Sequence, residues 1–127
     1  DPACFLLGNR GERDYSGLAK QQTAILEVNE VNDGELVTRE LVEKYLGITR
    51  EARKKATPLA KKEDELRNLS SMLEMCDNYH SDATHFMEEG DLVRAFGAIN
   101  YAHAWLDAAV KIGLLDGHGD DVLFTLP

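Results

Sequence analysis

The feature that most constrains this chain is a continuous apolar repeat between Asp91 and Leu115. Successive members are four and three residues apart, which is the spacing of one face of an α-helix packed against a core. The repeat consists of Leu92, Phe96, Ile99, His103, Leu106, Val110 and Gly113. Because an apolar helix face must be buried against another element, the repeat predicts a long helix within a multi-helix fold.

A second repeat of the same period predicts another long helix over residues 59–89. Its members are Leu66, Leu69, Leu73, Cys76, His80, Ala83 and Met87. Gly90 can end this helix and Asp91 can cap the next one, so the connection between them is very short. Two long helices joined this tightly are expected to form an antiparallel hairpin.

Residues 38–56 supply a third helical segment, which we expect to cover the broad apolar face of this hairpin. Thr38 has the chemistry of an N-cap, and Pro58 forces a boundary because the residue before proline avoids the α conformation. Gly47 is expected to interrupt or bend the segment, with Thr49 capping a continuation. The sequence thus predicts an all-α fold, an up-and-down three-helix bundle.

The residue pattern of 1–37 differs from that of the helical segments and predicts a short, β-hairpin-like N-terminal extension. A strand-like run at 24–31 is followed by the turn residues Asn32-Asp33-Gly34, although residues 18–28 also fit a helix. We therefore divide the chain into an extension, residues 1–37, and a bundle domain with a C-terminal tail, residues 38–127. The tail carries a short apolar patch, Val122-Leu123-Phe124, which is expected to dock on the bundle.

Charge and composition argue against several classes of function. The net charge of −9 over 127 residues opposes non-specific binding to nucleic acid and to anionic membrane surfaces. The sequence shows no secretion signal, no apolar run long enough to cross a bilayer, and no disulfide framework. We therefore expect a cytoplasmic protein without a membrane partner.

Four motifs resemble a known family. They are YLGITREA at 45–52, Tyr79-x-x-Asp-Ala-x-x-Phe86, the segment at 89–116 with its NYAHxWLDA core, and GDDxLFTL at 119–126. Over residues 38–126 the chain is similar to the archaeal family labelled domain of unknown function 357. The resemblance implies an archaeal up-and-down three-helix bundle, and it assigns no biochemical role.

Two histidines on the apolar faces are the strongest candidates for a metal or ligand site. In the hairpin, His80 and His103 lie at similar depth, with Asp107 one turn after His103 and Asn100 one turn before it. Two imidazoles and a carboxylate suit a divalent metal such as zinc or iron. With Asn100 they predict a ligand site inside the bundle. The alternative is a pair of histidines hydrogen-bonded to neighbours, Asp107 being the partner of His103, with no cofactor.

The last helix also carries a stripe of small residues beside a tryptophan. Ala98, Ala102 and Ala109 around Trp105 would let another helix approach closely, either a protein partner, a second copy of the chain, or the first helix of the bundle itself. No convergent catalytic set is visible in the sequence. The favoured hypothesis is therefore a non-catalytic protein-interaction or self-association module, with the metal or ligand site as the alternative.

A third hypothesis is nucleic-acid binding through residues 50–55. The segment 41–56 has the pattern of a helix-turn-helix, with Gly47 in the turn. The basic residues of its second half are Arg50, Arg53, Lys54 and Lys55. The acidic net charge and the early stop at Pro58 weigh against this hypothesis.

Overall fold

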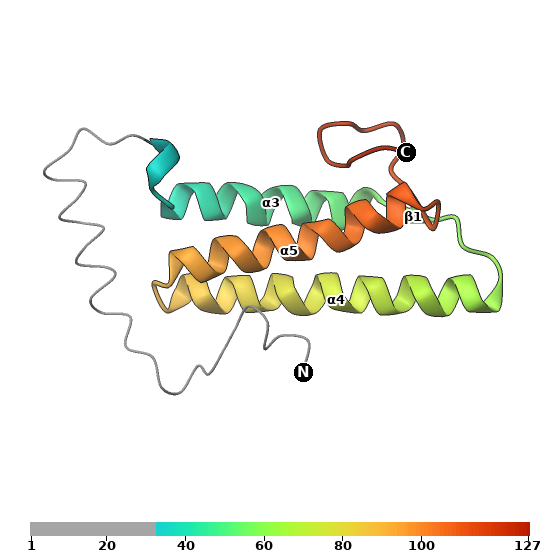
Figure 1. Ribbon diagram of the computed structural model, residues 1–127, viewed down its shortest axis with the longest axis horizontal. Helices are drawn as coiled ribbons and strands as arrows, with labels where there is room; N and C mark the ends of the chain where they lie inside the picture. Colours follow the sequence, from blue (N-terminus) through green and yellow to red (C-terminus); the bar gives the residue numbers. More distant parts are fainter. Residues whose placement is uncertain (1–32) are drawn as a thin grey trace, which may run out of the picture.

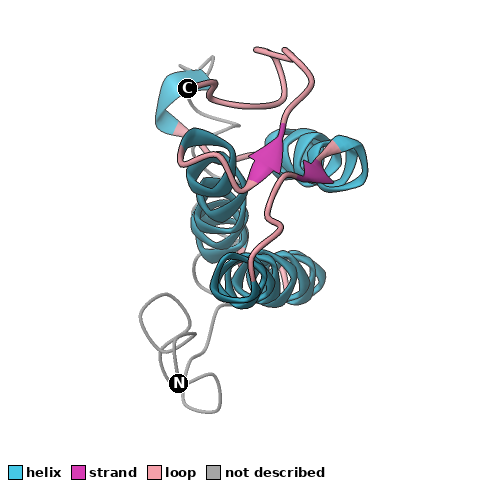
Figure 2. Ribbon diagram, turned by 90° about the vertical axis from the view of Figure 1, so that its right-hand side faces the viewer, coloured by secondary structure: helices cyan, strands magenta, loops and turns pink. Residues whose placement is uncertain are grey.

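The computed structural model describes residues 33–127, which form a bundle of three α-helices (Figure 1). The helices are α3 (Arg39–Lys55), α4 (Glu63–Glu88) and α5 (Leu92–Lys111). They run up, down and up, and the end-on view in Figure 2 places them at the corners of a triangle. The predicted all-α three-helix bundle is confirmed. Within residues 33–127, no helix combines the length and the apolar character that crossing a membrane requires.

Helix α3 is continuous, which corrects the predicted break at Gly47. Thr38 is its N-cap, since the Thr38 hydroxyl accepts a hydrogen bond from the Leu41 N–H at 3.1 Å. The helix runs through Gly47 and ends at Lys55, ahead of the boundary predicted from Pro58. Thr49 is buried within the helix and caps nothing. An isolated glycine costs a helix only about 1 kcal/mol, which burial of the flanking apolar residues can offset.

Helix α4 begins four residues later than the sequence predicted. The N–H groups of Leu59 and Ala60 both donate to the Leu114 carbonyl, at 2.9 and 3.2 Å, and this holds the segment in an extended conformation. The helix starts where the Glu65 carboxylate accepts from the Lys61 and Lys62 N–H groups. The apolar residue at position 59 therefore belongs to the connection that precedes the helix.

The turn between α4 and α5 is as short as the sequence predicts. Gly90 adopts a φ of +81°, a left-handed conformation that glycine reaches without a steric penalty. Asp91 caps α5, because its carboxylate accepts from the Arg94 N–H at 3.1 Å. The predicted helical hairpin is therefore present.

A pair of two-residue strands closes the far end of the bundle (Figure 2). β1 (Thr57–Pro58) pairs antiparallel with β2 (Leu115–Asp116). Beyond β2 the tail turns back onto the helices and buries Phe124, whose exposed fraction is 4%. The predicted docking patch is thus correct at Phe124 and wrong at Val122, which is 83% exposed.

The core lies where α5 meets both other helices, since α5 packs more extensively on α3 and on α4 than these two pack on each other. Its largest fully buried side chains are Tyr79, Phe86, Ile99, Leu106, Val42 and Val110.

Only the end of the predicted N-terminal extension falls within the described residues. Residues Asp33–Glu35 form a 3-10 helix, η2, where the sequence predicted a hairpin turn. The predicted strand at 24–31 and its helical alternative at 18–28 lie outside the described residues. The division of the chain after residue 37 stays a prediction.

Candidate functional site

A groove of about 700 Å³ lies between α3 and α4. It forms because both helices pack chiefly on α5, so that their facing sides are not pressed together. From α3 it is lined by Thr49, Arg50, Arg53 and Lys54, and from α4 by Cys76, Asp77, His80, Ser81, Thr84, His85 and Glu88. Most of these side chains are polar or charged, in contrast to the apolar contact between α4 and α5.

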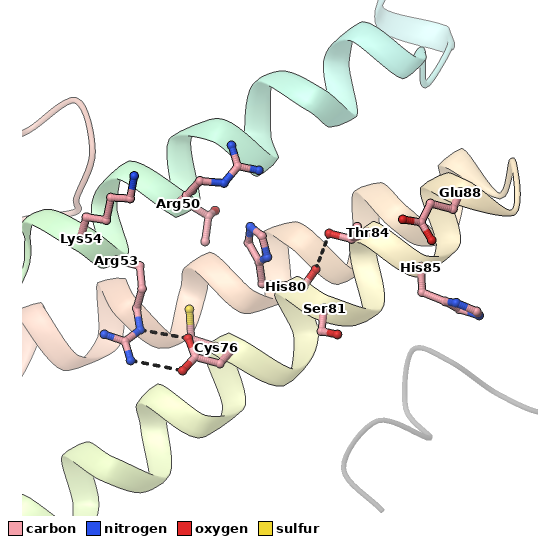
Figure 3. A pocket seen from close by; sticks show the side chains of 11 residues that line it. Arg50, Arg53, Lys54, Cys76, His80, Ser81, Thr84, His85 and Glu88 are labelled. Carbon is pink, nitrogen blue, oxygen red and sulfur yellow. Dashed lines mark hydrogen bonds and ion pairs between the residues drawn. The ribbon is translucent and has the colours of Figure 1, made fainter.

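His80 is the polar side chain at the bottom of this groove. Figure 3 shows its ring extending from α4 towards α3. The Nε2 atom is buried and has no hydrogen-bond partner among the described residues. Leaving a buried polar group unsatisfied costs about 1–3 kcal/mol. The folded chain therefore leaves one imidazole nitrogen of a groove-lining residue without a hydrogen-bond partner.

Arg53 and Asp77 form an ion pair that spans the groove from α3 to α4 (Figure 3). The Arg53 guanidinium donates to both carboxylate oxygens of Asp77, at 2.9 and 3.2 Å, and this pairing raises the pKa of Arg53. Arg50, one turn earlier on α3, makes no ion pair with any residue in the described part of the chain.

Cys76 touches the groove but belongs to the core. Its side chain is 1% exposed, and burial raises the pKa of its thiol to about 12. Because the thiolate is the reactive form of cysteine, this thiol is held in an unreactive state at neutral pH.

His103 lies behind the groove with both ring nitrogens occupied. Its Nε2 donates to the Leu123 carbonyl at 2.8 Å, since a carbonyl oxygen can only accept. In the neutral ring, Nδ1 then accepts from the Thr49 hydroxyl at 3.0 Å. Asp107, whose carboxylate is 3.5 Å from His103 Nε2, accepts from the N–H of Thr125 at 2.9 Å. His103 and Asp107 thus hold the C-terminal tail against the bundle.

The structure does not assemble the predicted metal site. His80 points from α4 towards α3, whereas His103 is bonded to Thr49 and to the tail. Across residues 33–127, no group of three or more histidine, cysteine, aspartate or glutamate side chains is arranged to hold a metal ion. Asn100 is exposed, and its amide donates to the Phe96 carbonyl of its own helix. Of the predicted ligand set, only His80 lies in the groove.

The three alanines of the predicted interaction surface on α5 are buried inside the bundle, so they are not open to another molecule. Ala98, Ala102 and Ala109 have no exposed area. Their small side chains allow close packing within the bundle, the alternative that the sequence left open. Trp105 is half-buried at the edge of this stripe, with its ring edge-on to Tyr101 at 6.0 Å.

The helix-turn-helix prediction is also corrected, because α3 is one unbroken helix. Two of the four basic side chains in the run at its end are closely paired within the chain. Arg53 bonds Asp77, and Lys55 bonds Asp120 at 2.7 Å, which holds the pKa of Asp120 below its usual range. These two ion pairs neutralise half of the run, and they leave Arg50 and Lys54 as its remaining positive charges.

The groove itself was not predicted from the sequence. Arg50 on α3 was assigned to a DNA-binding run, and Thr84 on α4 was not identified as a candidate. A usable signal was present, because Asp77, Ser81 and Thr84 recur at helical spacing beside the apolar stripe of α4. Such a polar stripe next to a histidine in the apolar repeat marks a helix edge that faces a polar space.

These observations define a small helical-bundle protein with a polar groove along one side. The chain belongs to the family described as protein of unknown function (DUF357), whose family model matches residues 44–115, more than half of the chain. The match confirms the family that the motifs indicated and contains every residue that lines the groove. No curated protein and no solved structure matches this chain.

Proposed function

We propose that this protein is a non-catalytic ligand-binding bundle that holds a small polar molecule in the groove between α3 and α4. The observation that carries the proposal is the buried, unpartnered Nε2 atom of His80 at the bottom of that groove. Small-molecule sites commonly occupy clefts of about 300–1,000 Å³ with a few convergent polar groups. Gaps between the helices of a bundle are a usual place for them.

The surroundings of His80 favour binding over reaction. Thr84 donates its hydroxyl proton to the His80 carbonyl at 3.2 Å, which leaves the Thr84 oxygen free to accept. The neighbouring thiol, Cys76, is held protonated. The groove therefore offers a hydrogen-bonding surface rather than an activated nucleophile.

The test compares His80→Leu with His80→Gln in the absence of ligand. If Nε2 is unsatisfied, leucine removes a buried polar atom and should raise the free energy of unfolding by about 1 kcal/mol. Glutamine keeps an N–H group near the same place and should leave the stability close to that of the wild type. The measurement is chemical denaturation followed by circular dichroism. A loss of about 1 kcal/mol or more in His80→Leu would show instead that the imidazole already has a structural partner.

A protein-interaction or self-association role is the second candidate. Its support is the exposure of two large apolar side chains outside the groove, Ile112 at 65% and Val122 at 83%. Size-exclusion chromatography with light scattering tests the self-association version. We expect wild-type dimers that Ile112→Ser or Val122→Ser weakens. A clean monomer at high protein concentration would contradict self-association.

A further inference from the structure

We propose, resting on the ligand-binding function above, that the ligand of the α3–α4 groove carries a small oxyanion, a phosphate or carboxylate group, held between the Arg50 guanidinium and the His80 ring.

The first reason is the charge of the groove. Its lining contains three basic side chains and two acidic ones, although the chain as a whole has a net charge of −9. The basic members are Arg50, Arg53 and Lys54, and the acidic members are Asp77 and Glu88. A locally positive cleft in an acidic protein attracts anions to that place and repels them elsewhere.

The second reason is the way these charges are paired. Arg53 and Asp77 neutralise each other through two hydrogen bonds. Lys54 is 3.8 Å from Glu51 on the exposed side of α3, a separation at which an exposed ion pair contributes little. Arg50 keeps its full charge with no ion-pair partner in residues 33–127. Its guanidinium is thus available to a ligand.

The third reason is the arrangement of the groove (Figure 3). Arg50 on α3 and His80 on α4 come from facing helices near the middle of the groove, whereas Glu88 lies at the far end of the labelled part of α4. The carboxylate of Glu88 therefore lies away from the middle of the groove, which Arg50 and His80 line from facing helices. An anion between these two residues meets donors on both walls.

The donor set matches an oxyanion. A guanidinium presents parallel N–H groups that suit two oxygens of one phosphate or carboxylate. The His80 ring supplies a further N–H donor when Nε2 carries the proton. A cationic ligand would face the unpaired charge of Arg50, and a purely apolar ligand would leave Nε2 unsatisfied.

The experiment is a nuclear magnetic resonance titration of the full chain with sodium phosphate and, separately, with sodium acetate. Sodium chloride keeps the ionic strength constant and the pH is fixed. We expect saturable shifts of the Arg50 guanidinium and His80 imidazole signals. A tighter phosphate curve would assign a phosphoryl ligand, and a tighter acetate curve a carboxylate ligand. Binding of either anion at these two side chains supports the proposal.

Two variants of equal charge change provide the control. Arg50→Gln should weaken anion binding about tenfold or more, because it removes a charge-assisted, bidentate contact. Arg67→Gln removes the same charge from α4 outside the groove, where Arg67 is paired only loosely with Glu63 at 3.5 Å. It should change the affinity by less than about twofold. Equal weakening in both variants would overturn the proposal, since it would report general charge attraction.

A screen of neutral small molecules separates this inference from the proposed function. One outcome is that neutral compounds bind in the groove, that His80→Leu abolishes their binding, and that Arg50→Gln leaves their affinity unchanged. This outcome would overturn the oxyanion assignment and leave the ligand-binding function standing. If neither anions nor neutral compounds shift the signals of the groove residues, both proposals fail together.

Discussion

The two helix contacts made by α4 are built from opposite kinds of side chain. Against α5, the helix buries residues such as Tyr79 and Phe86, whose exposed fractions are 1% and 0%. Facing α3, the same helix lines a groove with Asp77, His80 and Ser81. The α4–α5 contact is an apolar core, and the α3–α4 side is polar and open.

This difference indicates how the chain divides its tasks. Apolar burial supplies most of the free energy of folding, and the α4–α5 hairpin contributes buried residues from Leu69 to Phe86 on α4 and from Ala95 to Val110 on α5. A buried imidazole nitrogen without a hydrogen-bond partner works against stability, so it is expected where a ligand completes the site. The polar side is therefore the part of the molecule to search for function.

The largest effect is expected in the apolar contact. Phe86→Ala should reduce the free energy of unfolding by about 3–5 kcal/mol, because it leaves a cavity in a fully buried site. Leu66→Ala, on the same helix at a residue that is 47% exposed, is the control and should cost about 1 kcal/mol or less. Urea denaturation measures both. Similar losses of unfolding free energy in the two variants would show that the apolar contact with α5 is not the main source of stability in α4.

An intermediate effect is expected at His103, which joins the back of the groove to the C-terminal tail. His103→Ala leaves the buried Thr49 hydroxyl and the Leu123 carbonyl without their partner, at a cost of about 1–3 kcal/mol. His85→Ala removes another histidine, from an exposed pair with Glu89, and should cost less than about 0.5 kcal/mol.

Hydrogen exchange gives the local readout for His103→Ala. The amide of Thr125, which donates to Asp107, should exchange faster as the tail loosens, while amides in the middle of α4 keep their relative protection. Unchanged exchange in the tail would show that His103 is not what holds it.

The smallest effect is expected for the ion pair across the polar groove. Arg53 and Asp77 are well aligned but partly exposed, with side-chain exposures of 39% and 55%. A double-mutant cycle with Arg53→Gln and Asp77→Asn should give a coupling energy of about 0.2–1 kcal/mol that falls with added salt. A salt-independent coupling of about 3 kcal/mol would mean that the groove is as closed as the core.

Much of the fold was predictable because helical periodicity is a local property. The repeat that begins at Leu92 and the Gly90-Asp91 turn give the hairpin directly, and Thr38 marks the start of α3. The break predicted at Gly47 was wrong, since packing of the surrounding residues outweighs the weak helix propensity of glycine. The family, too, follows from motifs within short segments.

The sequence by itself determined which residues are apolar, how often they recur and therefore which segments are helices. Only the tertiary structure decided which polar groups find partners. His80 and His103 occupy equivalent places in their repeats, yet His103 meets Thr49, 54 positions away, and Leu123, 20 positions away. The Nε2 atom of His80 meets no partner in residues 33–127. Hydrogen bonds join atoms that folding brings together from distant parts of the chain, and local periodicity carries no record of them.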